Sequence, residues 1–298
     1  MDFKKYVPLG EYSSFRIGGT ADLFFEASGA GELRAAVTFA RRERIPFYVI
    51  GGGYNILFAD EGYRGLIIRN RAQGIRPGPG ANEFLVLSGT SLSRVLDYAL
   101  ENCLEGLEFL AGIPGSVGGA VFSNAGSFGR AVGDLLVATV FLDREGNERN
   151  LSPEEMEFGY RRSILQARHE IVLEARFRAV PGDPGAILAR IRENMEKRKL
   201  KHPAWGTPCA GSYFKNPVLP DGTKIPAGRL LEEAGAKECR VGDAAVFSGH
   251  ANFLINLGRA RAADMRTLAA ELKARVKAKS GILLEEEVIY LPEAFSMA

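Results

Sequence analysis

The sequence is poor in the side chains that build metal centres and disulfide frameworks. It holds three cysteines and three histidines among 298 residues. Cys103, Cys209 and Cys239 lie far apart, without the paired spacing of a zinc site or a disulfide framework. No histidine stands at metal-ligand spacing from another. We therefore expect no bound metal and a reducing, cytoplasmic location.

An excess of charge of one sign is also missing. The 38 basic and 36 acidic residues leave a net charge of +2, so no global field attracts nucleic acid. The N-terminus, MDFKKYVPLG, has no apolar signal core, and no segment has the composition of a membrane span. We expect neither a nucleic-acid nor a membrane partner. With 46% apolar and 25% charged residues, the chain is long enough for two or three globular domains.

The most informative segment runs from Phe109 to Gly129, twenty-one residues without a charge, six of them glycine. A membrane helix is excluded because Gly112, Pro114 and the Gly118-Gly119 pair interrupt it repeatedly. A loop is predicted instead. Glycines allow backbone N–H groups to approach a ligand closely, and successive N–H groups form an anion-binding concavity. This segment suits a phosphate-rich cofactor.

Hydrophobic periodicity divides the rest of the chain into helices and strands. Helices are predicted over 32–44, over 92–99 with Thr90 or Ser91 as N-cap, from 186 to the basic run 197–201, and over 259–279 with Gly281 as the C-terminal stop. Strands are predicted over 46–50, 66–68, 84–87, 135–142, 171–180 and 282–291, with a loop over 73–82 and a linker over 181–185. The order of elements indicates three α+β units.

The strand 46–50 leads into Gly51-Gly52-Gly53, a second candidate for phosphate binding. It is not a dinucleotide-binding fingerprint, because position 56 is Ile56 where glycine is needed, and no Gly-Lys-Ser/Thr follows for a phosphate-binding P-loop. A triple glycine alone is equally compatible with a tight turn. Together with the glycines of 112–129, a diphosphate site is favoured.

The segment 211–217, GSYFKNP, places a hydroxyl, an ammonium and an amide close together. It can be a structural turn, and no G-x-S-x-G elbow makes Ser212 a hydrolase nucleophile. A positioned serine can instead deliver a proton. Three further features have ordinary alternatives: the run 197–201 as a solvated helix end, Glu285-Glu286-Glu287 as an exposed cluster whose alternate members share one face, and Cys209 as a thiol without a role.

Taken in order, the motifs resemble those of the UDP-N-acetylenolpyruvoylglucosamine reductase family, flavoenzymes of bacterial peptidoglycan precursor synthesis. The resemblance spans nearly the whole chain. It rests on SFRIGG at 14–19, GGGYNIL at 51–57, GLEF through IPG to NAG over 106–126, FGYRRS at 158–163, GSYFKNP at 211–217, the AG pairs at 227–228 and 234–235, HANF at 250–253, and LEEEV at 284–288.

This resemblance implies an α+β protein whose FAD-binding fold, of the PCMH type, has two α+β domains and is joined to a third α+β domain that binds substrate. We expect residues 1–72 and 281–298 to form the first FAD-binding domain, 73–185 the second, and 186–280 the substrate-binding domain. It also implies non-covalent FAD and a ping-pong reaction, in which NADPH reduces the flavin and UDP-N-acetylglucosamine enolpyruvate is then reduced to UDP-N-acetylmuramate. We expect a monomer.

The same resemblance implies roles for individual residues. Arg161 matches the cation that stabilises an enolate-like charge, Ser212 the proton donor, and Glu287 a third active-site residue that orients a neighbour or acts as a protonated carboxyl. Lys201, Asn216 and His250 match substrate contacts, with Lys215 as an alternative to Lys201. The implied FAD contacts are Gly51, Gly52, Gly53, Tyr54, Asn55, Ile113, Pro114, Gly115, Ser116, Gly118, Gly119, Asn124 and Gly126.

Two departures and two rival functions accompany this resemblance. The short interval between Arg161 and Ser212 indicates the lidless (type II) branch of the family, and Arg229 stands where an apolar residue is common. One rival is a flavin oxidase of the same superfamily, which would need no proton donor such as Ser212. The other is a nucleotide-binding module without catalysis, disfavoured because all three catalytic positions match.

Overall fold

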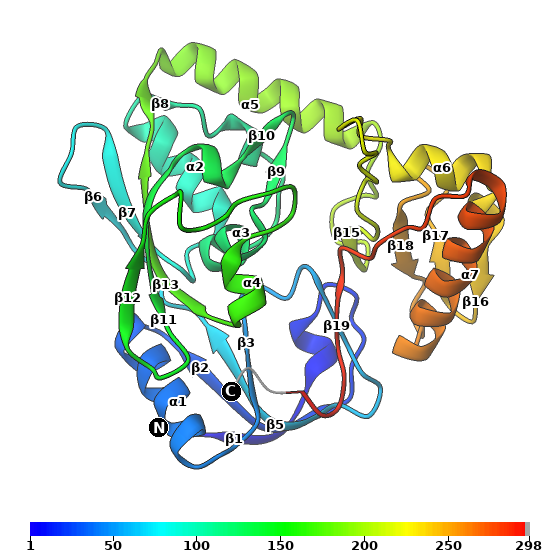
Figure 1. Ribbon diagram of the computed structural model, residues 1–298, viewed down its shortest axis with the longest axis horizontal. Helices are drawn as coiled ribbons and strands as arrows, with labels where there is room; N and C mark the ends of the chain where they lie inside the picture. Colours follow the sequence, from blue (N-terminus) through cyan, green and yellow to red (C-terminus); the bar gives the residue numbers. More distant parts are fainter. Residues whose placement is uncertain (296–298) are drawn as a thin grey trace.

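The structure is a computed structural model that describes residues 1–295. Its first unit is the four-stranded sheet β1-β2-β5-β3 (Figure 1), built from β1 (Lys4–Pro8), β2 (Thr20–Ala27), β5 (Tyr63–Asn70) and β3 (Phe47–Ile50). Helix α1 (Ala30–Arg42) packs on it through Leu33, Ala36, Val37 and Ala40, the apolar positions that predicted it. The unit is extended by a parallel pair of β4 (Ile56–Phe58) with β19 (Ile289–Leu291). The two ends of the chain therefore meet in one unit.

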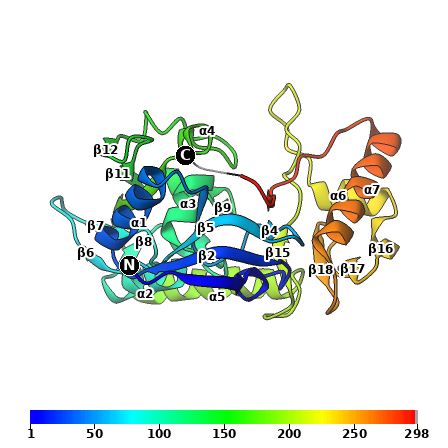
Figure 2. The same cartoon turned by 90° about the horizontal axis from the view of Figure 1, so that it is seen from below.

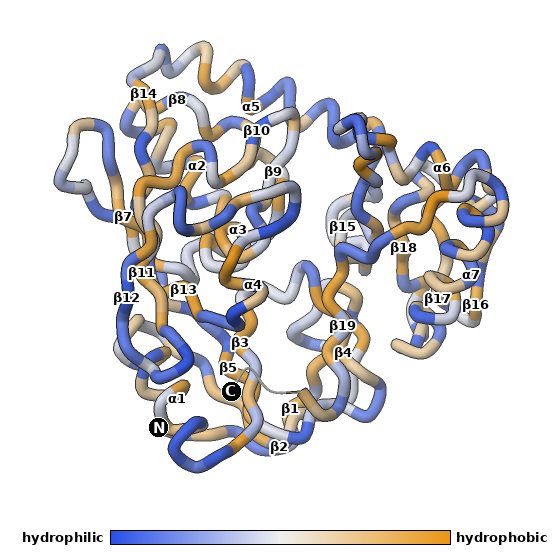
Figure 3. The backbone as a smooth tube through the Cα atoms, in the orientation of Figure 1, coloured by the Kyte–Doolittle hydropathy of each residue, from blue (hydrophilic) through white to orange (hydrophobic). Residues whose placement is uncertain are grey.

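The second unit is the antiparallel sheet β12-β11-β13-β7-β6. Its strands are β6 (Ile75–Pro77), β7 (Glu83–Leu87), β11 (Leu136–Leu142), β12 (Glu148–Leu151) and β13 (Ile171–Arg178). Figure 3 shows the polar edge strand β12 beside the apolar β11. Helix α2 (Leu92–Glu101) begins at Ser91, whose hydroxyl accepts a hydrogen bond from the Arg94 N–H at 3.2 Å. Of the two predicted caps, Ser91 is therefore the one used.

The third unit lies to one side of the other two in both ribbon views (Figures 1 and 2), and its core cluster includes Phe15, Ile17 and Leu57 of the first unit. Its sheet has the order β15 (Cys209–Ser212), β18 (Phe253–Asn256), β17 (Ala244–Val246) and β16 (Arg240–Val241). Helices α6 (Ala227–Glu233) and α7 (Ala262–Ser280) complete it. As predicted, α7 buries Met265, Leu268, Leu272 and Val276, and it ends at Gly281 with φ 73°.

Three sequence predictions are wrong in detail. The predicted loop 73–82 contains β6, which pairs with β7 as a hairpin. Of the predicted strand 282–291, only β19 forms a regular strand. Before β19, Glu286 forms an isolated bridge with Phe214. The glycine-rich stretch contains a helix, α3 (Val117–Ser123), and is not a continuous loop. Gly118 permits this helix because a Cβ there would lie 3.0 Å from Cβ of Ser88, so the helix packs closely against the end of β7.

Helix α5 (Pro184–Lys199) connects the second and third units. Its Arg190 forms ion pairs with Glu105 and Glu108, and Asn194 donates to the carbonyl of Glu108 at 2.9 Å. These contacts lie on the second unit, whereas the predicted boundary at residue 185 assigned this helix to the third. We propose that the third domain begins after α5.

Short elements complete the chain, and none of the helices in residues 1–295 is long and apolar enough to cross a membrane. The short elements are the 3₁₀ helices Leu9–Tyr12, Glu108–Leu110, Val132–Asp134 and Ala236–Glu238, the helix α4 (Ile164–Arg168), and the strands β8 (Leu104–Glu105), β9 (Gly126–Ser127), β10 (Arg130–Ala131) and β14 (Val180–Pro181).

Candidate active site

A cleft of about 2320 Å³ lies where the three units meet. Ligand pockets for drug-sized molecules are typically about 300–1,000 Å³, so this one has room for more than one extended ligand. All thirteen residues predicted to contact FAD line it, and so do Arg161, Ser212 and Glu287. The residues that the motifs assigned to one site therefore line one cleft in the structure.

One wall of the cleft is a cradle of backbone formed by the turn after β3. A Cβ on Gly51 would lie 2.3 Å from the hydroxyl of Ser116, and one on Gly53 would lie 1.8 Å from the carbonyl oxygen of Tyr12. Gly53 also has φ 70°, a conformation that favours glycine. Within the described chain, the backbone N–H groups of Gly52, Gly53 and Tyr54 donate no hydrogen bond. Free N–H groups in a glycine turn fit a diphosphate.

Asn124 holds the far end of the glycine-rich segment. Its φ of 46° ends α3, its amide donates to the carbonyl of Gly159 at 2.9 Å, and its Oδ1 accepts from the N–H of Gly133 at 2.9 Å. Gly126 pairs with Ala131 in a short hairpin, where a Cβ would meet the carbonyl of Arg130 at 2.3 Å. These contacts shape the wall on which a flat cofactor could lie.

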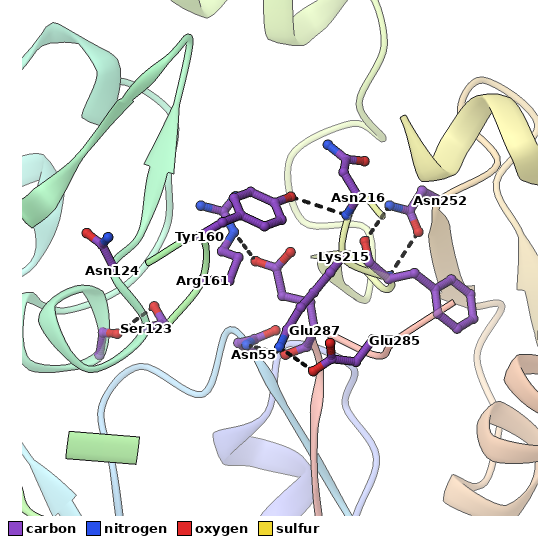
Figure 4. Close-up of polar contacts among 12 residues, drawn as sticks. Asn55, Ser123, Asn124, Tyr160, Arg161, Lys215, Asn216, Asn252, Glu285 and Glu287 are labelled. Carbon is purple, nitrogen blue, oxygen red and sulfur yellow. Dashed lines mark hydrogen bonds and ion pairs between the residues drawn. The ribbon is translucent and has the colours of Figure 1, made fainter. Parts of the chain in front are cut away.

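Arg161 and Glu287 point toward each other across the cleft (Figure 4), with Arg161 Nε 2.6 Å from Glu287 Oε1. The Nε–H does not align for a hydrogen bond, so the contact is an ion pair. Arg161 has φ 55°, uncommon for a residue with a side chain, and its guanidinium lies 5.4 Å from the ring centre of Tyr160. Strained backbone of this kind clusters at functional sites.

Glu287 is held from both sides along the backbone. Its N–H donates to the carbonyl of Tyr213 and its carbonyl accepts from the amide of Asn55, at 2.8 and 2.9 Å. Burial raises the pKa of the Glu287 carboxyl above its usual range, and the Arg161 charge and then the Lys215 charge oppose this rise. A raised pKa increases the fraction of the protonated, hydrogen-bond-donating form.

Ser212 closes β15, directly after Gly211 with φ 77°, and pairs with Phe253 of β18. The turn beyond it is fixed by Asn252, which is 2% exposed. Asn252 Oδ1 accepts from the N–H of Phe214 and its Nδ2 donates to the carbonyl of Phe214, both at 2.9 Å. Ser212 therefore lines the cleft at the end of a strand whose following turn is held by buried hydrogen bonds.

Of the four residues predicted to bind substrate, only Asn216 lines the cleft. Lys215 instead pairs with the exposed Glu285 at 2.5 Å. Lys201 is exposed just beyond the end of α5. His250 packs on Phe253, with ring centres 5.2 Å apart, in a space left by Gly228. The sequence could not show this, because it does not specify where side chains point.

Among the cleft residues that were not predicted are Arg16, Tyr160, His202 and Lys224. Tyr160 links two units, since its hydroxyl accepts from the N–H of Asn216 at 3.2 Å, and Lys224 lies 4.3 Å from its ring centre. Burial, assisted by Arg198, His250 and Lys201, lowers the pKa of His202 to about 4. Arg16 and Tyr160 stand inside recognised motifs, which was the available signal.

Two further residues singled out in the sequence are Cys209, as a thiol without a role, and Arg229, as an unusual residue type at its position. Burial raises the pKa of the Cys209 thiol, opposed by the Gly211 N–H, which disfavours the reactive thiolate. Arg229 pairs with Glu233 at 2.7 Å and does not line the cleft. The unusual residue type at position 229 therefore leaves the cleft wall unchanged.

Comparison with known proteins agrees with this geometry. Residues 21–152 match the model of an FAD binding domain, and residues 202–291 match the model of the UDP-N-acetylenolpyruvoylglucosamine reductase C-terminal domain. The fold and the glycine cradle thus define an oxidoreductase with an FAD-binding domain and an α+β architecture.

Full-length relatives identify the family. The chain is 40% identical to UDP-N-acetylenolpyruvoylglucosamine reductase of Synechococcus sp. (strain RCC307), over 98% of this chain and 94% of the relative. It is 41% identical to that of Moorella thermoacetica, over 94% and 90%. The solved structure of the Thermus caldophilus enzyme superposes with a TM-score of 0.80 at 35% identity, covering 98% of this chain and 100% of the other. The chain belongs to the UDP-N-acetylenolpyruvoylglucosamine reductase family, which confirms the resemblance seen in its motifs.

Proposed function

We propose that this protein reduces UDP-N-acetylglucosamine enolpyruvate to UDP-N-acetylmuramate with electrons from NADPH, as a step of peptidoglycan precursor synthesis. The observation that carries the proposal is the convergence of Arg161, Glu287 and Ser212 on the cleft that the glycine cradle also lines. FAD, when bound non-covalently in that cradle, supplies the hydride that it receives from NADPH.

Arg161 stabilises the charge that develops in this reaction. As a hydride adds to the methylene carbon of the enolpyruvyl ether, the double bond breaks and its electron pair moves toward the substrate carboxylate. A cation fixed before the reaction stabilises this enolate-like charge more than it stabilises the ground state. The ion pair with Glu287 and the ring of Tyr160 hold the guanidinium in place.

Ser212 then returns the proton. Its hydroxyl gives a proton to the carbon that bears the ether oxygen, which completes the saturated lactyl ether, and it regains a proton from solvent. Glu287 keeps Arg161 oriented through their ion pair, and its raised pKa favours the form that can donate a hydrogen bond to the substrate carboxylate. Arg161 acts at the substrate carboxylate and Ser212 at the carbon that bears the ether oxygen. Replacing one of them should therefore affect the reaction differently from replacing the other.

The third domain supplies the substrate contacts in this proposal. Asn216 lines the cleft, while its Oδ1 accepts from the N–H of Ala227 at the start of α6. Lys201, Lys215 and His250 lie in the same unit or at its entrance and are proposed to reach the diphosphate and sugar. The chain then belongs to the lidless branch and acts as a monomer in the cytoplasm.

The rival is a flavin oxidase of the same superfamily. Purified protein loaded with FAD would be given NADPH and UDP-N-acetylglucosamine enolpyruvate, with NADPH consumption, product mass and peroxide followed together. We expect one product molecule, heavier by a hydride and a proton, per NADPH consumed. Peroxide formed in proportion to an alcohol or hydroxy acid would support the oxidase. Absence of any turnover with bound FAD would support a binding module.

A further inference from the structure

The chain contains a single tryptophan, Trp205. Its side chain is exposed to solvent and lines the cleft. Trp205 is 82% exposed, although large aromatic residues usually bury most of their surface. It belongs to a run of six consecutive residues, 202–207, that all line the cleft. Within residues 1–295 no aromatic ring and no cation packs against the indole. Its wide apolar face is thus available to a ligand.

A hydrogen-bonded turn of the backbone fixes the position of Trp205. The N–H of Thr207 donates to the carbonyl of Ala204 at 3.0 Å, and Gly206 has φ 91°. This is a type II turn with Trp205 at its first central position and the required glycine at its second. The next residues are fixed too, since the N–H of Asn256 donates to the carbonyl of Pro208 at 2.9 Å.

A cation accompanies the tryptophan. Arg16, from the first unit, donates through Nη2 to the carbonyl of Gly206 at 3.3 Å. Arg16 lines the cleft, forms no ion pair among the described residues, and has φ 56°. The guanidinium of Arg16 therefore contacts the residue that follows Trp205 and has no carboxylate partner among residues 1–295. This pairing matches a nucleoside diphosphate, whose base stacks on aromatic faces and whose phosphates bind arginine.

The turn lies within residues 202–291, which match the family's C-terminal domain, and outside residues 21–152, which match the FAD-binding domain. It leads directly into β15, which carries Ser212. We propose that Trp205 stacks on the pyrimidine base of the nucleotide-sugar substrate and that Arg16 positions the turn and faces the diphosphate. This inference rests on the proposed function, since it assigns the base subsite of the same cleft.

The test compares ligands with and without a base, bound to the FAD-loaded protein and measured by calorimetry. We expect Trp205→Ala to weaken uridine diphosphate about 5- to 150-fold, the range for loss of one base stack, and to leave inorganic pyrophosphate unchanged. Trp205→Phe should retain most of the affinity. Leu200→Ala is the matched control, since Leu200 is 84% exposed and outside the cleft lining. A normal flavin spectrum establishes that each variant is folded.

Three results would overturn the inference. One is wild-type affinity for uridine diphosphate in Trp205→Ala, with substrate still reoxidising the wild-type flavin; the proposed function then stands without this subsite. The second is a loss limited to NADP⁺ binding, which would assign the ring to the nicotinamide cosubstrate. The third is a wild-type protein that neither binds uridine diphosphate nor is reoxidised by substrate, in which case the proposed function fails as well.

Discussion

Arg161 and Glu287 lie 2.6 Å apart, Nε to Oε1, although they come from the second unit and from the C-terminal segment that returns to the first. Their side chains are only 22% and 20% exposed. Burial raises the pKa of the Glu287 carboxyl, and the nearby Arg161 charge opposes this rise. The pair therefore fixes the Arg161 guanidinium in the cleft, which is the position that the proposed function requires.

The raised pKa of Glu287 predicts a pH-dependent effect on the free energy of unfolding. A carboxyl whose folded pKa is raised stabilises the fold below its unfolded pKa, near 4.5, and this contribution is lost as pH rises through the folded value. Glu287→Gln stays neutral, so its free energy of unfolding relative to the wild type should increase with pH across that window. Denaturant titrations at several pH values measure it. A difference independent of pH would contradict the raised pKa.

Ser212→Ala should separate the two half-reactions. Reduction of the flavin by NADPH needs no proton from Ser212, whereas reoxidation by substrate does, and loss of one general acid typically costs about 10²–10⁴ in rate. Stopped-flow absorbance of the flavin measures both. Cys209→Ala, on the same strand and without an assigned role, is the control. Equal slowing of the two half-reactions would remove the proton-donor role.

Gly53→Ala should abolish tight FAD binding. The added Cβ would lie 1.8 Å from the carbonyl of Tyr12, and φ 70° adds strain. The control is Gly29→Ala, since a Cβ at Gly29 meets nothing within 4 Å and its φ is −149°. The measurement is FAD content after purification and the dissociation constant from flavin fluorescence. Full FAD occupancy in Gly53→Ala would exclude this turn as part of the cradle.

His202 should cause part of any loss of stability in mild acid. A histidine whose folded pKa is lowered to about 4 stabilises the fold above its unfolded pKa of 6.5, and this stabilisation declines as pH falls from 6.5 toward 4. His202→Gln should show a shallower decline over that window. The exposed Lys199→Gln serves as the control. An NMR titration that places the His202 pKa near 6.5 would contradict the prediction.

Asn252→Ala should destabilise the third unit. It leaves the buried N–H and carbonyl of Phe214 without partners, at about 1–3 kcal/mol each. We expect a lower denaturant midpoint and slower substrate reduction, because the turn that carries Ser212 and Asn216 loses its clamp. Asn102→Ala, on the exposed end of α2, controls for asparagine removal. Unchanged stability would show that water replaces both contacts.

Periodicity predicted the regular helices well because their apolar faces are local in sequence. Leu33, Val37 and Ala40 of α1 and Met265, Leu268 and Leu272 of α7 are buried as expected. Helix α3 was missed because Gly118 and Gly119 are poor helix formers, and the close contact with Ser88 explains the glycine at position 118. The motifs indicated Arg161, Ser212 and Glu287. The pairing of Arg161 with Glu287, the exposed position of Lys201 and the pairing of Lys215 with Glu285 depend on packing between units.

The most direct test is an anaerobic visible spectrum of the FAD-loaded protein, bleached with NADPH and then mixed with UDP-N-acetylglucosamine enolpyruvate. The proposed function predicts that the oxidised flavin bands return on addition of substrate. A spectrum that bleaches but does not recover would contradict the assigned substrate, and a protein that takes up no FAD after reconstitution would contradict the role of the glycine cradle.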